Sequence, residues 1–275
     1  MIAGALKKLA RLLRNWLADL GLSAWERAGA RYARRWPSSH DASPELLKTD
    51  VLNPLLRFFQ DHKSGPGVWK WIHYFEAYHR HLERFRNTSP RILEVGIYSG
   101  GSLEMWKDYF GPGCQIYGVD IEPACKAYET DAVRVLIGDQ ADRTFWRHAL
   151  ANGTIPLLDA VIDDGGHEPI QQRITLEELL PHVRPGGVYI CEDIHGQDNE
   201  FAAYIAGLIH ELNATAFGIL ESEDPERRLS AIPTGFQSAI HSIHCYPFLT
   251  VIEKSAIPIP EFRCPKRGSQ WEPFL

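Results

Sequence analysis

The chain has 275 residues and a formal net charge of −6 at pH 7, and its apolar and charged fractions, 44% and 23%, are those of a soluble globular protein. This length allows one large α/β domain with an appendage. The charge is uneven, because residues 1–36 contain eight Lys or Arg and two Asp or Glu, and so carry +6 and leave −12 for the rest. An acidic main body argues against a surface that binds nucleic acid.

The five cysteines are odd in number and form no CxxC pair. That pattern favours reduced thiols over a disulfide framework or a zinc site. We therefore expect a cytoplasmic protein.

The N-terminal residues predict an amphipathic helix, with an apolar face (Leu6, Leu9, Leu13, Trp16, Leu17, Leu20) and a basic face (Lys7, Lys8, Arg11, Arg14). The apolar stripe is too interrupted for a membrane span, and no signal-peptide cleavage site follows it. Such a helix can lie weakly on an anionic membrane surface. Packing on its own domain or on a partner subunit is the favoured interpretation, and it predicts a homo-oligomer.

Three segments follow from composition along the chain. Residues 37–44, rich in Pro and Ser, predict a linker, and residues 46–59 predict a short helix interrupted by Pro54. We expect a helical appendage and linker over 1–60, the main domain over 61–255, and a tail over 256–275 whose Trp271 and Phe274 dock on the protein.

A polar, glycine-containing loop over 61–67 precedes a predicted aromatic helix that runs from Trp69 to Leu82. Its histidines are His73, His79 and His81. Helix aromatics usually serve packing, but the position of this helix just ahead of a glycine turn also makes it a plausible lid over a ligand.

From residue 91 the pattern alternates between apolar strands and amphipathic helices. Strands are predicted over 91–95, 115–119, 133–137, 160–162 and 188–191, with helices over 102–110, 142–150 and 170–180, and a final antiparallel pair over 239–245 and 249–253. This alternation predicts an α/β fold, a doubly wound and mostly parallel seven-stranded sheet.

The turn after the first strand contains Gly96, Gly100 and Gly101, followed by Ser102 as a candidate N-cap. A strand, a glycine turn and a helix N-terminus bring backbone N–H groups close to a polar ligand. Glu94 at the strand end adds an acceptor. On the glycines alone, an ordinary strand–helix turn is an equal alternative.

Acidic residues follow five successive strands: Glu94, Asp120, Asp139, Asp163 with Asp164, and Glu192 with Asp193. The carboxyl ends of parallel strands meet at one crevice, where ligands bind. Acids gathered there repel one another, so a cationic ligand or a metal is expected to offset them.

The acids suggest two ligands. Asp120 can accept both hydroxyls of a ribose, but Tyr98 stands where a dinucleotide motif has its second glycine, so a positively charged nucleoside such as S-adenosylmethionine fits better. Asp164, Asp193 and Glu192 suit Mg²⁺. His167 at the rim is the predicted general base, and His195 is a weaker second candidate.

A series of motifs, in the order 94–103, 117–120, 138–140, 162–167, 184–187 and 192–193, resembles the class I S-adenosylmethionine-dependent methyltransferases. It is most similar to the metal-dependent sugar O-methyltransferases of macrolide and related natural-product pathways, over roughly residues 65–255. The resemblance implies that Asp164 and Asp193 bind Mg²⁺ and that His167 is the base. It does not place the third metal ligand, for which Glu192 is favoured. The residues expected to bind the methyl donor are Glu94, Gly96, Tyr98, Ser99, Gly100, Ser102, Asp120, Asp139, Gln140 and Asp163.

The expected function is methyl transfer from S-adenosylmethionine to a hydroxyl of a sugar, glycoside or glycan, assisted by Mg²⁺. A phenol or catechol acceptor, or a methyltransferase-like protein that binds without turnover, is the alternative. The intact Asp164, His167 and Asp193 count against the non-catalytic reading.

Overall fold

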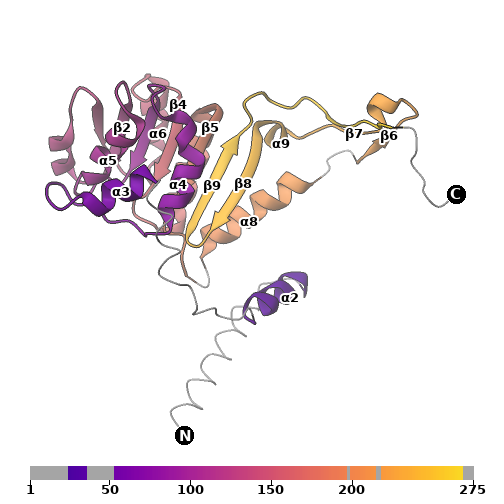
Figure 1. Cartoon of the computed structure of the whole chain (residues 1–275), viewed down its shortest axis with the longest axis horizontal. Coiled ribbons are helices and arrows are strands. Elements are labelled where there is room, and N and C mark those ends of the chain that lie inside the picture. Colours follow the sequence, from indigo (N-terminus) through magenta and orange to yellow (C-terminus); the bar gives the residue numbers. More distant parts are fainter. Residues whose placement is uncertain (1–23, 36–52, 197–198, 215–217, 269–275) are drawn as a thin grey trace, which may run out of the picture. The chain divides into compact units, whose positions relative to one another are not determined.

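The computed structural model describes residues 24–35, 53–196, 199–214 and 218–268 (Figure 1). The chain divides into two compact units, one of residues 1–50 with 196–198 and one of residues 51–195 with 199–275. Within the smaller unit the described helix is α2 (Ala24–Ala33). The predicted helix over the first 20 residues, the linker at 37–44, and Trp271 and Phe274 lie outside the described residues. Among the helices that are described, none has the length and apolarity needed to cross a bilayer.

The larger unit is organised around a seven-stranded sheet with the order β3-β2-β1-β4-β5-β9-β8. Its strands are β1 (Arg91–Val95), β2 (Gln115–Asp120), β3 (Val133–Ile137), β4 (Leu158–Asp163), β5 (Val183–Cys191), β8 (Ile240–Tyr246) and β9 (Leu249–Lys254). The first five are parallel, whereas β9 is antiparallel to both β5 and β8. The predicted doubly wound, mostly parallel sheet is confirmed.

Helices bury both faces of this sheet, which explains the unbroken apolar runs of its strands. Successive residues alternate between two cores, so that Ile92 faces one and Leu93 the other. Helices α3 (Pro54–Asp61), α4 (Tyr74–Leu82) and α5 (Gly101–Phe110) contribute to the first core, and α6 (Arg143–Ala151), α7 (Pro169–Leu179) and α8 (Glu200–Asn213) to the second.

Short elements complete the described part of the unit. They are the 3₁₀ turns η2 (Glu83–Phe85), η3 (Pro123–Tyr128), η4 (Leu180–His182) and η5 (Pro225–Arg227), helix α9 (Gly235–Ala239), and a small sheet of β6 (Leu220–Glu221), β7 (Leu229–Ala231) and β10 (Phe262–Cys264).

Two predicted helix starts differ from the structure by more than one residue. Pro54 begins α3 instead of interrupting a helix, because proline fits the first turn and the Asn53 side chain accepts from two following backbone N–H groups. Helix α3 also packs into the first core, so it is part of the larger unit rather than the appendage. Helix α4 begins at Tyr74, which leaves Trp69 and Trp71 in an irregular segment ahead of it.

The predicted N-cap of α5 is also wrong. The cap is Gly100, with a φ of 78° that favours glycine, and Ser102 lies inside the helix. The Ser102 hydroxyl is therefore free to bond elsewhere, and it donates to Glu94.

Candidate active site

A cavity of about 690 Å³ opens at the carboxyl ends of the parallel strands. Its walls are the turn between β1 and α5, the residues that follow β2 to β5, and the segment 67–71. Most predicted site residues line it: Gly96, Tyr98, Ser99, Ser102, Asp120, Asp139, Gln140, Asp164, His167, Glu192, Asp193 and His195. The structure thus gathers at one crevice the residues that the strand ends predicted.

Gly96 allows the ends of β1 and β4 to approach closely. Its φ is +89°, and a Cβ there would lie 2.0 Å from the backbone oxygen of Asp164. No other residue fits this position without moving the backbone of the β4 end. The glycine therefore sets the distance between the turn that follows β1 and the acids that follow β4.

Asp120 ties the glycine turn to the end of β2. Its Oδ2 accepts from the backbone N–H groups of Ile97 and Tyr98 at 2.8 and 2.9 Å, and its Oδ1 accepts from Glu122 N–H at 2.9 Å. These amide bonds outweigh partial burial and lower the pKa of Asp120, so the group is ionised. Both lone pairs of Oδ2 are used by the two amides, whereas Oδ1 keeps a further lone pair, and the residue lines the cavity as a ribose acceptor must.

Glu94 lies beneath the crevice and is fully buried. It accepts from Ser102 Oγ and from Trp106 Nε1, each at 2.9 Å. Burial raises its pKa to about 7, although Lys70 and Trp106 act in the opposite direction. Glu94 therefore anchors α5 to β1, and it neighbours the cavity wall through Ser102 and Lys70.

Lys70 is a buried cation among these acids, and no motif in the sequence indicated it. Its Nζ donates to Asp164 Oδ2 at 2.5 Å and to both oxygens of Glu192 at 2.9 and 3.0 Å, and it lies 4.0 Å from Glu94. Burial lowers the pKa of Lys70, but attraction to the three carboxylates outweighs it and raises the pKa well above its usual range. The protein itself therefore supplies part of the positive charge that we expected from a ligand or a metal.

Glu192 is paired with Lys70 and does not lie in one group with the other predicted metal ligands. The group whose ligand atoms lie within 4.8 Å of one another consists of Asp164, His167 and Asp193. His167 Nε2 lies 3.8 Å from Asp164 Oδ1 and 3.5 Å from Asp193 Oδ2. The residue predicted as the base thus takes the third place in the cluster, and the assignment of Glu192 as a ligand stays a prediction.

The cluster fits a divalent cation that prefers oxygen ligands. The carboxylate oxygens that face His167 are not those that bind Lys70, Trp71 and Tyr74, so two anionic ligand atoms remain directed to one point. His167 and Asp193 both have positive φ, 60° and 55°, a backbone conformation that few residues other than glycine adopt. The Nδ1 atom of His167 is buried without a hydrogen-bond partner, which leaves Nε2 as the atom directed at the acids.

Asp193 is positioned by the segment before α4 and by the first residue of that helix. Its Oδ1 accepts from Trp71 Nε1 at 2.8 Å and from Tyr74 Oη at 2.9 Å. Tyr74 Oη also lies 3.1 Å from the backbone oxygen of Phe248, at the turn between β8 and β9. The aromatic residues predicted as a lid therefore orient an acid of the cluster.

Three predicted donor-binding residues do not line the cavity: Glu94, Gly100 and Asp163. Asp163 is buried and accepts from Gln140 and Tyr189, and burial raises its pKa to about 7. Gln140 also accepts from Gly166 N–H at 2.6 Å. Asp163 therefore supports the loop that carries His167 from below, through Gln140.

Lys70 is a site residue that the sequence did not indicate, and for Trp71 and Tyr74 it indicated a lid instead of hydrogen bonds to an acid of the cluster. The signal that could have revealed them was the aromatic segment ahead of the glycine turn, which contains one lysine between two tryptophans. Their partners are distant in sequence: Lys70 pairs with Asp164 and Glu192 across 94 and 122 positions.

The sheet, the glycine turn and the acidic crevice together define the Rossmann-like fold of the class I methyltransferases. No family model matches the chain. Comparison with known proteins confirms the resemblance predicted from the motifs, to O-methyltransferases that tailor sugars of macrolides and related natural products.

Two curated relatives illustrate this similarity. The mycinamicin VI 2''-O-methyltransferase of Micromonospora griseorubida is 34% identical over 209 residues, which are 67% of this chain and 49% of that protein. The 8-demethyl-8-alpha-L-rhamnosyl tetracenomycin-C 2'-O-methyltransferase of Streptomyces olivaceus is 34% identical over 210 residues, 70% of this chain and 53% of that protein. The chain thus spans about half the length of the curated relatives it matches.

A solved structure agrees with the sequence comparison. The MycE methyltransferase of the mycinamycin biosynthetic pathway, in complex with Mg and SAH, is 30% identical and aligns with a TM-score of 0.57 over 74% of this chain and 54% of that one. A second MycE structure also contains mycinamycin VI.

Proposed function

We propose that this protein is an S-adenosylmethionine-dependent and Mg²⁺-dependent O-methyltransferase that acts on a sugar hydroxyl of a glycosylated small molecule. The observation that carries the proposal is the cluster of Asp164, His167 and Asp193, which lines the same cavity as the glycine turn and Asp120. A base and two carboxylates thus lie beside a site suited to a cationic nucleoside. The two relatives are methyltransferases of mycinamicin VI and of a rhamnosyl tetracenomycin, which supports a sugar acceptor.

The residues assign each half of the reaction to one side of the cavity. Asp120 and the backbone around Gly96 hold the donor, and the acidic crevice favours its positively charged sulfonium. The C–S bond of the donor breaks as a C–O bond forms to the acceptor, and the hydroxyl proton passes to His167 Nε2. His167 Nε2 lies 3.8 and 3.5 Å from Asp164 and Asp193, so the base and the two carboxylates that would hold the metal face the same part of the cavity.

Asp164 and Asp193 are the residues that would hold Mg²⁺, and the bound ion would lower the pKa of the acceptor hydroxyl. Lys70 keeps Asp164 and Glu192 in place by ion pairs on the side away from His167. The chain's own contribution is orientation, because the sulfonium methyl is already activated and proximity supplies much of the acceleration.

Calorimetric titration with S-adenosylmethionine and its demethylated product tests donor binding directly. We expect saturable heat with both, and donor binding that persists in excess chelator. Methyl transfer to a rhamnosylated or macrolide glycoside acceptor should be abolished by the chelator and restored by Mg²⁺. Absence of heat from folded protein with either nucleoside would contradict the proposal. Full turnover in excess chelator would show that the reaction does not need a metal ion.

We further propose a cytoplasmic homo-oligomer whose assembly depends on residues 1–36. The excess of basic residues in that segment supports an interaction role. The cysteines of the described residues are all free thiols, as a reducing compartment requires.

A further inference from the structure

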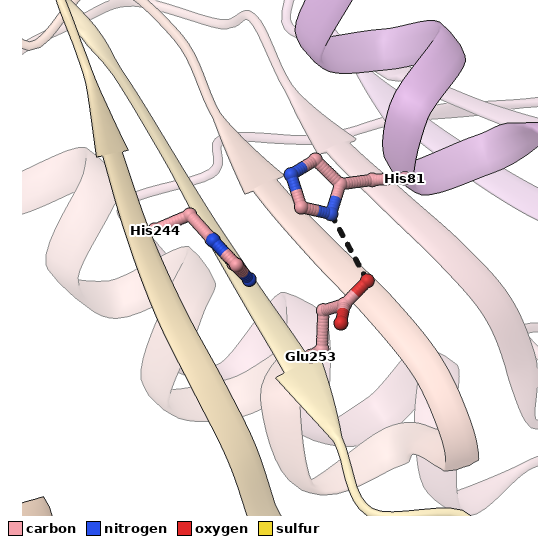
Figure 2. Close-up of side chains that lie close together, drawn as sticks. All are labelled: His81, His244 and Glu253. Atoms are coloured by element: carbon pink, nitrogen blue, oxygen red, sulfur yellow. Dashed lines mark hydrogen bonds and ion pairs between the residues drawn. The ribbon is translucent and has the colours of Figure 1, made fainter.

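A second group of metal-ligating side chains lies away from the crevice, between α4 and the β8–β9 hairpin. Figure 2 shows His81 from the last turn of α4 facing His244 on β8 and Glu253 on β9. In the hairpin register, His244 pairs with Val251 and Ser242 pairs with Glu253. His244 and Glu253 are therefore diagonal neighbours on the face that α4 covers.

The three side chains converge closely enough to share one ion. One ligand atom from each lies within 4.8 Å of the other two. His81 Nδ1 is 3.0 Å from Glu253 Oε1, and the two imidazole rings are 4.6 Å apart between centroids. Ligand atoms around a tetrahedral zinc ion are separated by about 3.3 Å, so a small movement of the half-buried His244 would complete the set.

Both imidazoles have an orienting partner on one ring nitrogen. His81 Nε2 lies 2.9 Å from the hydroxyl of Tyr246, and His244 Nε2 lies 2.9 Å from the hydroxyl of Ser242. Metal-bound histidines almost always use their second nitrogen in this way, which fixes the tautomer and the ring plane. The Nδ1 proton of His81 is shared with Glu253 Oε1 at 3.0 Å, and a divalent cation can replace that proton and bind both atoms.

A metal ion at this position would compete with a neighbouring arginine for the Glu253 carboxylate. Arg84 Nη1 donates to its Oε1 at 2.9 Å, and Arg80 lies near enough to act electrostatically on His244. The side chain of Arg84 is 43% exposed and that of Glu253 is 13% exposed, so the arginine can turn toward solvent when a metal ion takes its place at the carboxylate. The carboxylate therefore remains accessible to a cation that can also use the two imidazoles.

We infer that His81, His244 and Glu253 form a site for a divalent transition metal of the zinc class. Two imidazoles and one carboxylate select such an ion over Mg²⁺, and the half-buried position leaves a fourth place for water. The bound ion joins the end of α4 to the hairpin. The start of α4 and the hairpin turn already meet through Tyr74 and Phe248, so the ion stabilises the same contact that positions Asp193.

The site is tested with Zn²⁺ as the probe, on untagged full-length chain stripped with chelator and returned to excess Mg²⁺. The crevice cluster is excluded by working in a His167→Ala background. Equilibrium dialysis followed by elemental analysis should give one equivalent of Zn²⁺ at micromolar concentration. His244→Ala and Glu253→Gln should each weaken binding at least tenfold, and Co²⁺ should give the absorption bands of a tetrahedral site only where both residues are intact.

Controls separate this site from adventitious binding on the same strand. His241→Ala and Cys245→Ser lie on β8 outside the triad, and zinc binding should persist in both. Melting temperatures with and without Zn²⁺ show that each variant is folded. Zn²⁺ should raise the melting temperature of the parent but not that of His244→Ala or Glu253→Gln. Zinc stoichiometry that neither triad substitution changes, or a parent that binds no zinc, would overturn the inference and leave the triad as a hydrogen-bonded link.

Discussion

At the scale of single residues, His167 is the side chain that the proposed reaction needs most. We expect His167→Ala to lower turnover by roughly 10²–10⁴-fold, the usual contribution of a positioned proton acceptor. Affinity for the donor should barely change, because Nε2 faces Asp164 and Asp193 rather than the glycine turn. Single-turnover kinetics with a calorimetric donor titration measure both.

His195→Ala is the matched control for the role of His167, because His195 also lines the cavity. If His167→Ala retains near-native turnover while His195→Ala loses it, His195 is the base.

Lys70 offers a residue-scale prediction about stability. Lys70→Met leaves the buried carboxylate of Glu192 and the adjoining Asp164 without their cation. Removing one partner of a buried ion pair typically costs about 3–5 kcal/mol, and we expect a loss of that size in the free energy of unfolding. Urea denaturation without divalent metal measures it.

Lys63 is the control, because it is exposed in the loop that precedes the same segment. Lys63→Met should change the free energy of unfolding by about 0.5 kcal/mol or less. Equal stability of the two variants would show that the acids do not depend on Lys70.

At the scale of elements, the turn between β1 and α5 depends on close backbone packing. Gly96→Ala introduces a Cβ 2.0 Å from the oxygen of Asp164, so β1 and β4 must separate. We expect donor binding to be lost and the free energy of unfolding to fall by more than about 3 kcal/mol.

Gly153→Ala isolates the cost of the backbone conformation alone. Gly153 also has positive φ, +74°, but no atom lies within 4 Å of an added Cβ. This variant should lose only about 1–2 kcal/mol and should bind the donor normally. Similar losses in both variants, by urea denaturation, would rule out the contact with Asp164 as the cause.

The link between Glu94 and α5 makes stability depend on pH. Burial raises the pKa of Glu94 from 4.5 to about 7. The folded state therefore binds the proton more tightly than the unfolded chain, and this contribution to stability is complete below about pH 4.5 and is lost as the pH rises through about 7. The raised pKa corresponds to about 3 kcal/mol at neutral pH.

Glu94→Gln removes this titration, so the stability of the variant relative to the parent should rise across the same pH range. Urea denaturation at several pH values, without donor or metal, measures the difference. The comparison cancels groups such as Glu253, whose pKa is lowered to about 2 by His81 and Arg84 and which acts in the opposite direction at lower pH. A constant difference between variant and parent would contradict the raised pKa.

At the scale of the whole molecule, residues 1–36 carry +6 against −12 for the remainder. If this segment mediates assembly, deleting it should reduce the mass in solution to that of one chain. Light scattering after size-exclusion chromatography measures the mass. An unchanged mass, with binding to anionic vesicles lost on deletion, would support a membrane-surface role instead.

The sequence alone determined the sheet and the position of its crevice. Apolar runs such as 91–95, the glycines that follow them and the acids at the strand ends are local features, because a strand buried on both faces must be continuously apolar and its turn must contain small residues. The structure confirms the strands that these features predict, and its cavity lies at the strand ends. The resemblance of the motifs, which the relatives bear out, has the same local origin.

Tertiary structure decided how the charged groups are paired. Helical periodicity could not show that Lys70 neutralises Glu192 from 122 positions away, or that the third member of the cluster is His167. It also could not show that His81 meets Glu253 across 172 positions. A charged side chain in the interior is stabilised by whichever partner the packed elements bring within a few ångströms, and that proximity exists only after the sheet and its helices have assembled.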